Sequence, residues 1–163
     1  MAVEIERKFR IVDQSWRAAA ASRRLLRQGY LANTARASVR VRLAGDQAWL
    51  SVKAMTPGRA RDEYEVAIDP GDAQQMLDRL CEGPPLEKWR HIVVHDGNRW
   101  EIDEFLGANA GLVIAEIELE SEAQEFARPA WLGVEVTHEQ RYYNFRLAQH
   151  PYTHWPERLR AAT

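Results

Sequence analysis

The 163-residue sequence contains a single cysteine, Cys81. One cysteine excludes an internal disulfide framework and is typical of proteins from a reducing compartment. The sequence also lacks any apolar run long enough for a transmembrane helix. The residues that follow Met1 lack the apolar core of a signal peptide. We therefore expect a small cytosolic protein.

The sequence has no excess of basic residues, since 22 Lys and Arg stand against 24 Asp and Glu, for a net charge of −2. Without a basic excess, we expect neither nucleic acid nor a membrane surface as a partner. The glycine-rich motifs GxxxxGK and GxGxxG are absent, which excludes P-loop and Rossmann nucleotide sites. No repeat or Pro/Gly-rich linker divides the chain, so we expect one domain over residues 1–163.

The sequence is rich in period-two alternation of apolar and charged residues, which is the pattern of β-strands. Turn signals at 44–47 and 96–98 predict two hairpins. Eight strands are predicted, at residues 3–9, 25–31, 38–43, 49–53, 61–68, 86–94, 99–105 and 112–120. Short helices are predicted at residues 13–21 and 69–80, from Ser121, from Thr137 to before Pro151, and from Pro156.

Charges of like sign recur two residues apart on strand after strand. Residues i and i+2 share one face of a strand, roughly 6.5–7 Å apart, so such pairs weaken a sheet unless counter-charges or a ligand compensate. A solvated face explains any one pair, whereas so many pairs in one small chain favour a shared, enclosed face. The pairs and groups are Glu4/Glu6, Arg40/Arg42, Glu63/Glu65, Lys88/Arg90, Glu101/Asp103 and Glu116/Glu118/Glu120, with Lys8 and Lys53 nearby.

Eight antiparallel strands can close into a barrel, in which one face of the sheet points inward. We therefore predict an α+β fold, a closed eight-stranded antiparallel β-barrel with helices packed outside. The outer apolar face is then covered by these helices or by a second subunit in a homodimer. Enclosed charges are costly unless they are paired, hydrated or bound to ions. Lys and Arg bind phosphate oxygens, and Mg²⁺ joins phosphates to carboxylates, so the pattern indicates a polyanion held with a divalent metal.

The charged pairs also match a known family. Glu4-Ile5-Glu6-Arg7-Lys8 has the ExExK signature of the CYTH superfamily, also called triphosphate tunnel metalloenzymes. The resemblance continues in order through Arg40-Val41-Arg42, Leu50-Ser51-Val52-Lys53, Glu63-Tyr64-Glu65, Lys88-Trp89-Arg90, Ile102-Asp103 and Glu116-Ile117-Glu118. The short bacterial branch is resembled most closely, through Gln28-Gly29-Tyr30-Leu31, Pro129-Ala130-Trp131-Leu132-Gly133, Glu135-Val136-Thr137 and Arg141-Tyr142. One departure is Tyr143, where close relatives often carry Lys.

The resemblance implies a closed eight-stranded tunnel that binds triphosphate compounds with divalent cations. It implies that the phosphates are bound by Lys8, Arg40, Arg42, Lys53, Lys88 and Arg90. It implies that Mg²⁺ or Mn²⁺ is held, directly or through water, by Glu4, Glu6, Asp103, Glu116 and Glu118, with Glu63 and Glu65 as supports. It further implies that Tyr30 lies beside Lys8 and helps to activate the attacking water.

These expectations favour a metal-dependent triphosphatase that cleaves a terminal phosphoryl group by water attack. Inorganic tripolyphosphate is the first choice of substrate, since no base-recognition element is evident in the sequence. The enzymatic alternatives are a class IV adenylyl cyclase, which needs an adenine pocket, and a thiamine triphosphatase. A non-enzymatic polyphosphate- or nucleotide-binding module is less favoured, because it would keep the cations and lose the carboxylates.

Overall fold

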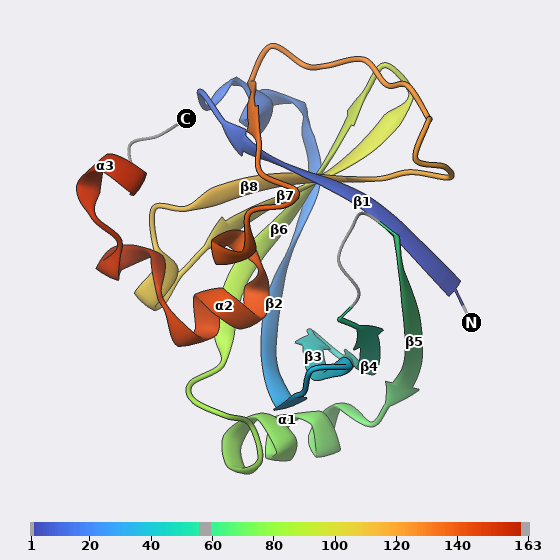
Figure 1. Ribbon diagram of the computed structural model, residues 1–163, viewed down its shortest axis with the longest axis vertical. Helices are drawn as coiled ribbons and strands as arrows, with labels where there is room; N and C mark the ends of the chain where they lie inside the picture. Colours follow the sequence, from blue (N-terminus) through green and yellow to red (C-terminus); the bar gives the residue numbers. More distant parts are fainter. Residues whose placement is uncertain (1, 56–59, 161–163) are drawn as a thin grey trace.

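A computed structural model describes residues 2–55 and 60–160. Its main feature is one antiparallel sheet that closes on itself (Figure 1). The eight barrel strands run in the order β5-β4-β3-β2-β6-β7-β8-β1, and β1 pairs with β5 to complete the ring. Their bounds are β1 Ala2–Ile11, β2 Ala20–Asn33, β3 Ala37–Ala44, β4 Gln47–Ala54, β5 Ala60–Ile68, β6 Leu86–His95, β7 Asn98–Phe105 and β8 Val113–Glu118. The predicted closed eight-stranded barrel is confirmed.

A ninth strand, β9 (Leu132–Glu135), pairs with the end of β1 and was not predicted, because four residues are too few to display an alternation. The helix predicted from Ser121 is wrong. Instead, Gln124 Oε1 accepts a hydrogen bond from the backbone N–H of Glu120 at 2.7 Å, which forms an isolated turn. The chain then runs without helix toward β9 while Phe126 packs on the barrel. Burial of this ring overrides the local capping signal.

Helix α1 (Pro70–Arg79) begins where the sequence predicts, and Asp69 Oδ1 accepts the N–H of Asp72 at 3.1 Å. In place of the helix predicted at 13–21, the structure has a 3₁₀ turn, η1 (Ser15–Ala19), and β2 begins at Ala20. Thr137 does not cap a helix, because its hydroxyl accepts the N–H of Lys8 at 3.0 Å. The remaining short helices are η2 (Gly107–Asn109), η3 (Gln140–Tyr142), α2 (Asn144–Gln149), η4 (Tyr152–His154) and α3 (Glu157–Arg160).

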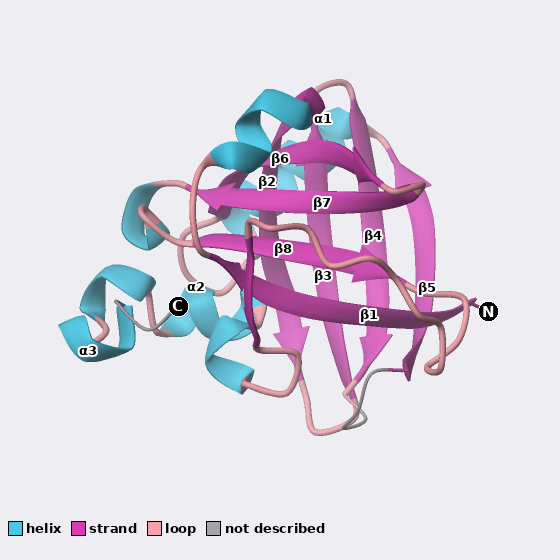
Figure 2. Cartoon of the chain, turned by 90° about the horizontal axis from the view of Figure 1, so that it is seen from above, coloured by secondary structure: helices cyan, strands magenta, loops and turns pink. Residues whose placement is uncertain are grey.

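The outer face of the barrel is apolar and is covered in two places. On the β3–β4 side, α1 lies against the barrel (Figure 1), and its Ala73 and Leu77 pack against Val41 and Ala48. On the β1–β8–β7 side, the segment between β8 and β9 crosses the strands (Figure 2). Its Trp131 packs in a cluster with the aromatic rings of Phe9, Trp16 and Trp100. The chain thus supplies much of its own cover. Among the described residues, no helix combines the length and hydropathy needed to span a membrane.

One end of the barrel interior is filled by the C-terminal segment. Leu147 and Trp155 pack there with the barrel residues Leu86, Phe105 and Ile114. The guanidinium of Arg10, farther along β1 than Lys8, donates to Tyr142 Oη at 3.1 Å and to the carbonyl of Arg160 at 2.9 Å. These contacts close this end of the barrel with an apolar plug. The charged inner face lies between the plug and the opposite rim of the barrel.

Candidate active site

A cavity of about 640 Å³ follows the inner face of the barrel. The register explains its lining, because antiparallel partners point to the same face: Tyr30 lies opposite Arg40, Arg40 opposite Ser51, and Ser51 opposite Glu65. Eleven of the predicted site residues line this cavity: Glu4, Glu6, Lys8, Arg40, Arg42, Lys53, Glu63, Glu65, Arg90, Glu116 and Glu118. Of the other three, Tyr30 lines a deeper chamber, and Lys88 and Asp103 are buried in the wall.

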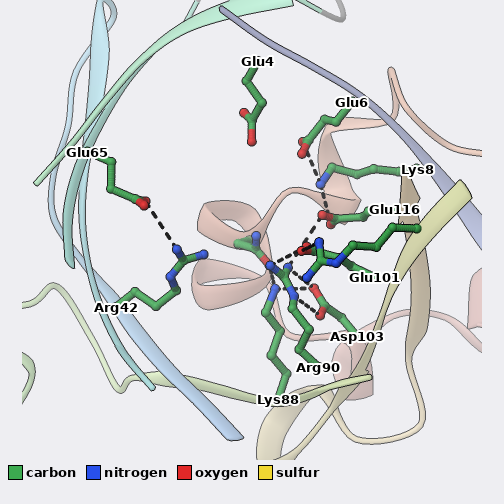
Figure 3. Close-up of polar contacts among 12 residues, drawn as sticks. Glu4, Glu6, Lys8, Arg42, Glu65, Lys88, Arg90, Glu101, Asp103 and Glu116 are labelled. Carbon is green, nitrogen blue, oxygen red and sulfur yellow. Dashed lines mark hydrogen bonds and ion pairs between the residues drawn. The ribbon is translucent and has the colours of Figure 1, made fainter. Parts of the chain in front are cut away.

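Lys8 lies between two carboxylates (Figure 3). Its Nζ is 3.0 Å from Oε1 of Glu6 and 2.6 Å from Oε1 of Glu116. Burial lowers the pKa of Lys8, but Glu116 and Glu6 outweigh burial and raise this pKa above its usual value. Burial raises the pKa of Glu6, but Lys8 and Lys53 outweigh it and hold this pKa well below the usual range. Lys8 and Glu6 are therefore charged at neutral pH.

The β3–β4–β5 wall repeats this pairing of opposite charges. Arg42 Nη2 lies 3.3 Å from Glu65 Oε2 (Figure 3), and Arg40 Nη2 lies 3.9 Å from Glu63 Oε1. Lys53 of β4 makes an ion pair with Glu4 of β1. The Nε atoms of Arg40 and Arg42 are buried and have no hydrogen-bond partner among the described residues. Because such donors are costly to leave unpaired, an anionic ligand with several acceptor oxygens fits this wall.

Asp103 is fully buried and is held by two cations (Figure 3). Its Oδ2 is 2.5 Å from Lys88 Nζ, and Arg90 donates from Nε to Oδ1 and from Nη2 to Oδ2, both at 2.8 Å. Burial raises the pKa of Asp103, but Arg90 and Lys88 outweigh burial and hold it far below the usual range. Burial lowers the pKa of Lys88 to about 8. Both oxygens of Asp103 thus contact cations, which orients Lys88 and Arg90, and its role as a metal ligand stays a prediction.

The remaining carboxylates lie close enough to repel one another. Burial raises the pKa of Glu4, and the neighbouring charge of Glu6 adds to this effect. Burial likewise raises the pKa of Glu118, with further contributions from Glu101 and Glu6. Glu118 forms no ion pair within the described ranges. A divalent cation would relieve this repulsion, so the donor set fits the hard, oxygen-seeking Mg²⁺ or Mn²⁺.

Residues 2–55 and 60–160 contain no preformed cluster of three or more His, Cys, Asp or Glu side chains placed to ligate one ion.

Tyr30 and Lys8 line one chamber, in which the sequence predicts an activated pair. Burial dominates and raises the pKa of Tyr30, although the positive charges of Arg40, Lys53 and Lys8 act in the opposite direction. The phenol is therefore protonated at neutral pH.

Some lining residues were not predicted as site residues, among them Glu101 and Asn144 of the cavity and Arg61 of the deeper chamber. Glu101 pairs with Arg90, with 2.6 Å between Oε2 and Nη1. Arg61 lies on β5 in register with Glu4. Glu101 lies two residues from Asp103, and Arg61 lies two residues from Glu63, so each shares a strand face with a predicted site residue. The alternation therefore contained a signal for both positions. Asn144 lies 3.4 Å from Lys88 Nζ through its Oδ1. It comes from α2, outside any strand pattern, so the sequence gave no comparable signal.

Comparison with known proteins gives a consistent result. The family model described as the CYTH domain matches residues 2–150. The inorganic triphosphatase of Acetivibrio thermocellus is 45% identical over 157 residues, which are 96% of this chain and 100% of that protein. The inorganic triphosphatase of Nitrosomonas europaea is 38% identical over 152 residues, covering 89% and 96%. A crystal structure of the inorganic triphosphatase NE1496 has a TM-score of 0.62 at 35% identity and covers 91% of this chain and 95% of that one.

Proposed function

Because the chain belongs to the CYTH family, we propose that it is a metal-dependent triphosphatase that hydrolyses inorganic tripolyphosphate. Relatives named inorganic triphosphatase match almost the whole chain at 45% and 38% identity. The observation that carries the proposal is the single inner cavity, which combines buried, unpartnered guanidinium donors with mutually repelling carboxylates. Phosphoryl transfer depends on this combination, because its catalysis is mainly positioning and charge stabilisation.

The basic residues bind the phosphate chain. Arg40 and Arg42 offer donors that no described residue satisfies, and their planar forks suit phosphate oxygens. Asp103 fixes Lys88 and Arg90 in place, so their remaining donors face a ligand without reorganisation. The phosphate-binding set is Lys8, Arg40, Arg42, Lys53, Lys88 and Arg90.

The carboxylates hold Mg²⁺ or Mn²⁺. A bound divalent ion would neutralise charge on the phosphates and polarise the phosphoryl oxygens. The residues that would hold it, directly or through water, are Glu4, Glu6, Glu116 and Glu118. Glu63 and Glu65 support Arg40 and Arg42 through the ion pairs at 3.9 and 3.3 Å.

Substrate choice is tested by incubating the purified protein with Mg²⁺ and tripolyphosphate, ATP or thiamine triphosphate, followed by chromatography of the products. We expect equal amounts of orthophosphate and pyrophosphate from tripolyphosphate, at a higher kcat/KM than for either organic triphosphate. Preferential hydrolysis of thiamine triphosphate, or formation of cyclic AMP from ATP, would replace the proposed substrate with one of the other family activities.

Tyr30 and Lys8 act on the attacking water, Tyr30 through its hydroxyl and Lys8 through its ammonium. Because burial raises the pKa of Tyr30, any ionisation of this phenol falls in the alkaline range, and kcat should rise with pH there. Tyr30→Phe keeps the ring and removes the hydroxyl. We expect it to lower kcat by about 10²-fold, the lower range for acid–base groups, and to flatten the alkaline limb. A wild-type kcat and pH profile in this variant would restrict Tyr30 to packing.

A further inference from the structure

A groove of about 460 Å³ adjoins the catalytic cavity at the end of the barrel away from the plug. Two strands locate it there. Leu86 of β6 and Phe105 of β7 pack in the plug, whereas Ile92 and Arg99, toward the other ends of the same strands, line the groove. The groove and the cavity are continuous, because both are lined by Arg42, Arg90, Arg99 and Glu101. An anion in the groove would therefore lie next to the catalytic cavity.

The groove differs from the cavity in its charge. The described lining of the cavity has eight carboxylates and six basic side chains. The described lining of the groove has one carboxylate, Glu101, and five arginines, Arg23, Arg24, Arg42, Arg90 and Arg99. Glu101 is already paired, with Arg90 Nη1 at 2.6 Å and with Arg99 Nη1 at 2.8 Å. The cavity thus needs a divalent cation before it accepts an anion, whereas the groove does not.

Arg24 is the least compensated of these arginines. In register it lies opposite another cation, Arg90 of β6, and opposed like charges destabilise a sheet unless a counter-charge or a ligand compensates. Arg90 is compensated by Asp103 and Glu101. Within residues 2–55 and 60–160, Arg24 has no carboxylate at ion-pair distance and donates to the neutral Gln47 Oε1, at 2.7 Å. Its charge is therefore available to an anion in the groove.

Arg42 connects the groove with the cavity. Its guanidinium lies 5.1 Å from the centre of the Trp49 ring, which also lines the groove and orients the cation. Burial lowers the pKa of Arg42, and the neighbouring charges of Arg40 and Arg90 lower it further, outweighing the nearby carboxylates. Positive charge is thus crowded where the two spaces meet, and an anion bound there would relieve the repulsion.

We propose that this groove is an anion-binding site that captures tripolyphosphate before the metal is in place, with Arg24 as a binding residue outside the catalytic cavity. The identity of the ligand rests on the proposed function. Arginine forks suit phosphate oxygens, and a local positive field speeds the encounter with an anion. The shared Arg42 and Arg90 then guide the anion into the cavity, where the carboxylates complete the site with Mg²⁺.

The test measures the Kd of tripolyphosphate by isothermal titration calorimetry, with protein freed of metal by EDTA and then dialysed into metal-free buffer. Wild type should bind, with an affinity that falls as salt is added. Arg24→Gln should raise the Kd by about five- to tenfold, as for an exposed, charge-assisted contact. The matched control is Arg79→Gln, an exposed position on α1, which should leave the Kd unchanged.

Lys53→Gln shows where the metal-free anion binds. Lys53 lines the cavity and not the groove, and it lies four residues, roughly 13 Å, from Trp49 along β4. At about 0.1 M salt, charges this far apart are largely screened, so the Kd should change by less than about twofold. Equal effects of Arg24→Gln and Lys53→Gln would place the anion in the cavity and overturn the proposal.

Absence of binding by the metal-free wild type, or an unchanged Kd in Arg24→Gln, would also overturn the proposal. Thermal unfolding identifies a folding defect, and Arg24→Lys, which keeps the charge without the fork, then provides the comparison. With saturating Mg²⁺, Arg24→Gln should also lower kcat/KM, and an unchanged kcat/KM would mean an adventitious anion site only. Failure of the metal-loaded wild type to hydrolyse tripolyphosphate would instead overturn the proposed function, so the two failures are distinguishable.

Discussion

Removal of divalent cations with EDTA is expected to abolish tripolyphosphate hydrolysis, and added Mg²⁺ or Mn²⁺ should restore it. Without a metal, the carboxylates of Glu4, Glu6 and Glu118 repel one another and also an anionic substrate. The measurement is phosphate release by protein dialysed against EDTA and then titrated with each ion. Full turnover in metal-free buffer would contradict the assignment of these carboxylates.

The same assignment predicts the effect of single neutral substitutions. Glu4→Gln and Glu116→Gln keep side-chain size and remove charge, so we expect both variants to fold and to lose about 10²- to 10³-fold in kcat, comparable to the loss of a transition-state electrostatic group. The control is Glu122→Gln, which lies exposed in the segment between β8 and β9. Equal, small effects at all three positions would place Glu4 and Glu116 outside the metal site.

Asp103→Asn is expected to lower the free energy of unfolding by about 3–5 kcal/mol at neutral pH, because it leaves the buried Lys88 without its counter-charge and removes one carboxylate partner of Arg90. Lys88 and Arg90 should also lose their orientation, so kcat/KM should fall by at least about tenfold, which corresponds to 1.4 kcal/mol. Urea unfolding and steady-state kinetics measure the two effects. Asp62→Asn, at an exposed position of β5, is the matched control and should be near neutral.

The pH dependence gives this prediction a second readout. Arg90 and Lys88 lower the pKa of Asp103 in the folded chain below that of an ordinary carboxyl. The contribution of Asp103 is therefore fully present above the unfolded pKa, about 4, and decreases as the pH falls toward the folded pKa. The difference in stability between wild type and Asp103→Asn should narrow on acidification below about pH 4. A difference that is already small at pH 7 would show that Asp103 is not held as a buried anion.

The closed barrel and its charged inner face could be predicted because the spacing of residues along one strand already determines which of them share a face. Glu4, Glu6 and Lys8 share a face whatever strand lies beside them. The pairing of carboxylates with cations depends on register, which is set by contacts distant in sequence. The sequence alone therefore could not reveal that Asp103 is enclosed by Lys88 and Arg90. The prediction that Asp103 ligates a metal rests on the resemblance alone, which does not include these contacts.

Two further differences between the predictions and the structure arise from contacts between residues that are distant in sequence. The capping pattern at Ser121 favours a helix locally, but the barrel surface is better covered when Phe126 packs beside Phe9 and Trp100. Arg61 has the parity of Glu63, so it was detectable in principle. Its contact with the Tyr143 ring was not, because Tyr143 lies between η3 and α2 and belongs to no strand. No strand pattern predicts a contact with a segment that enters the barrel from its end.

The central claim is that one inner cavity binds tripolyphosphate with a divalent metal and directs water to a terminal phosphorus. The most direct measurement is ³¹P NMR of the products formed from tripolyphosphate and Mg²⁺ in ¹⁸O-labelled water. Attack at a terminal phosphorus places the label in orthophosphate and leaves pyrophosphate unlabelled, with both products formed in equal amounts and neither formed in EDTA. Label in pyrophosphate would contradict terminal attack, and absence of any metal-dependent cleavage would contradict the triphosphatase itself.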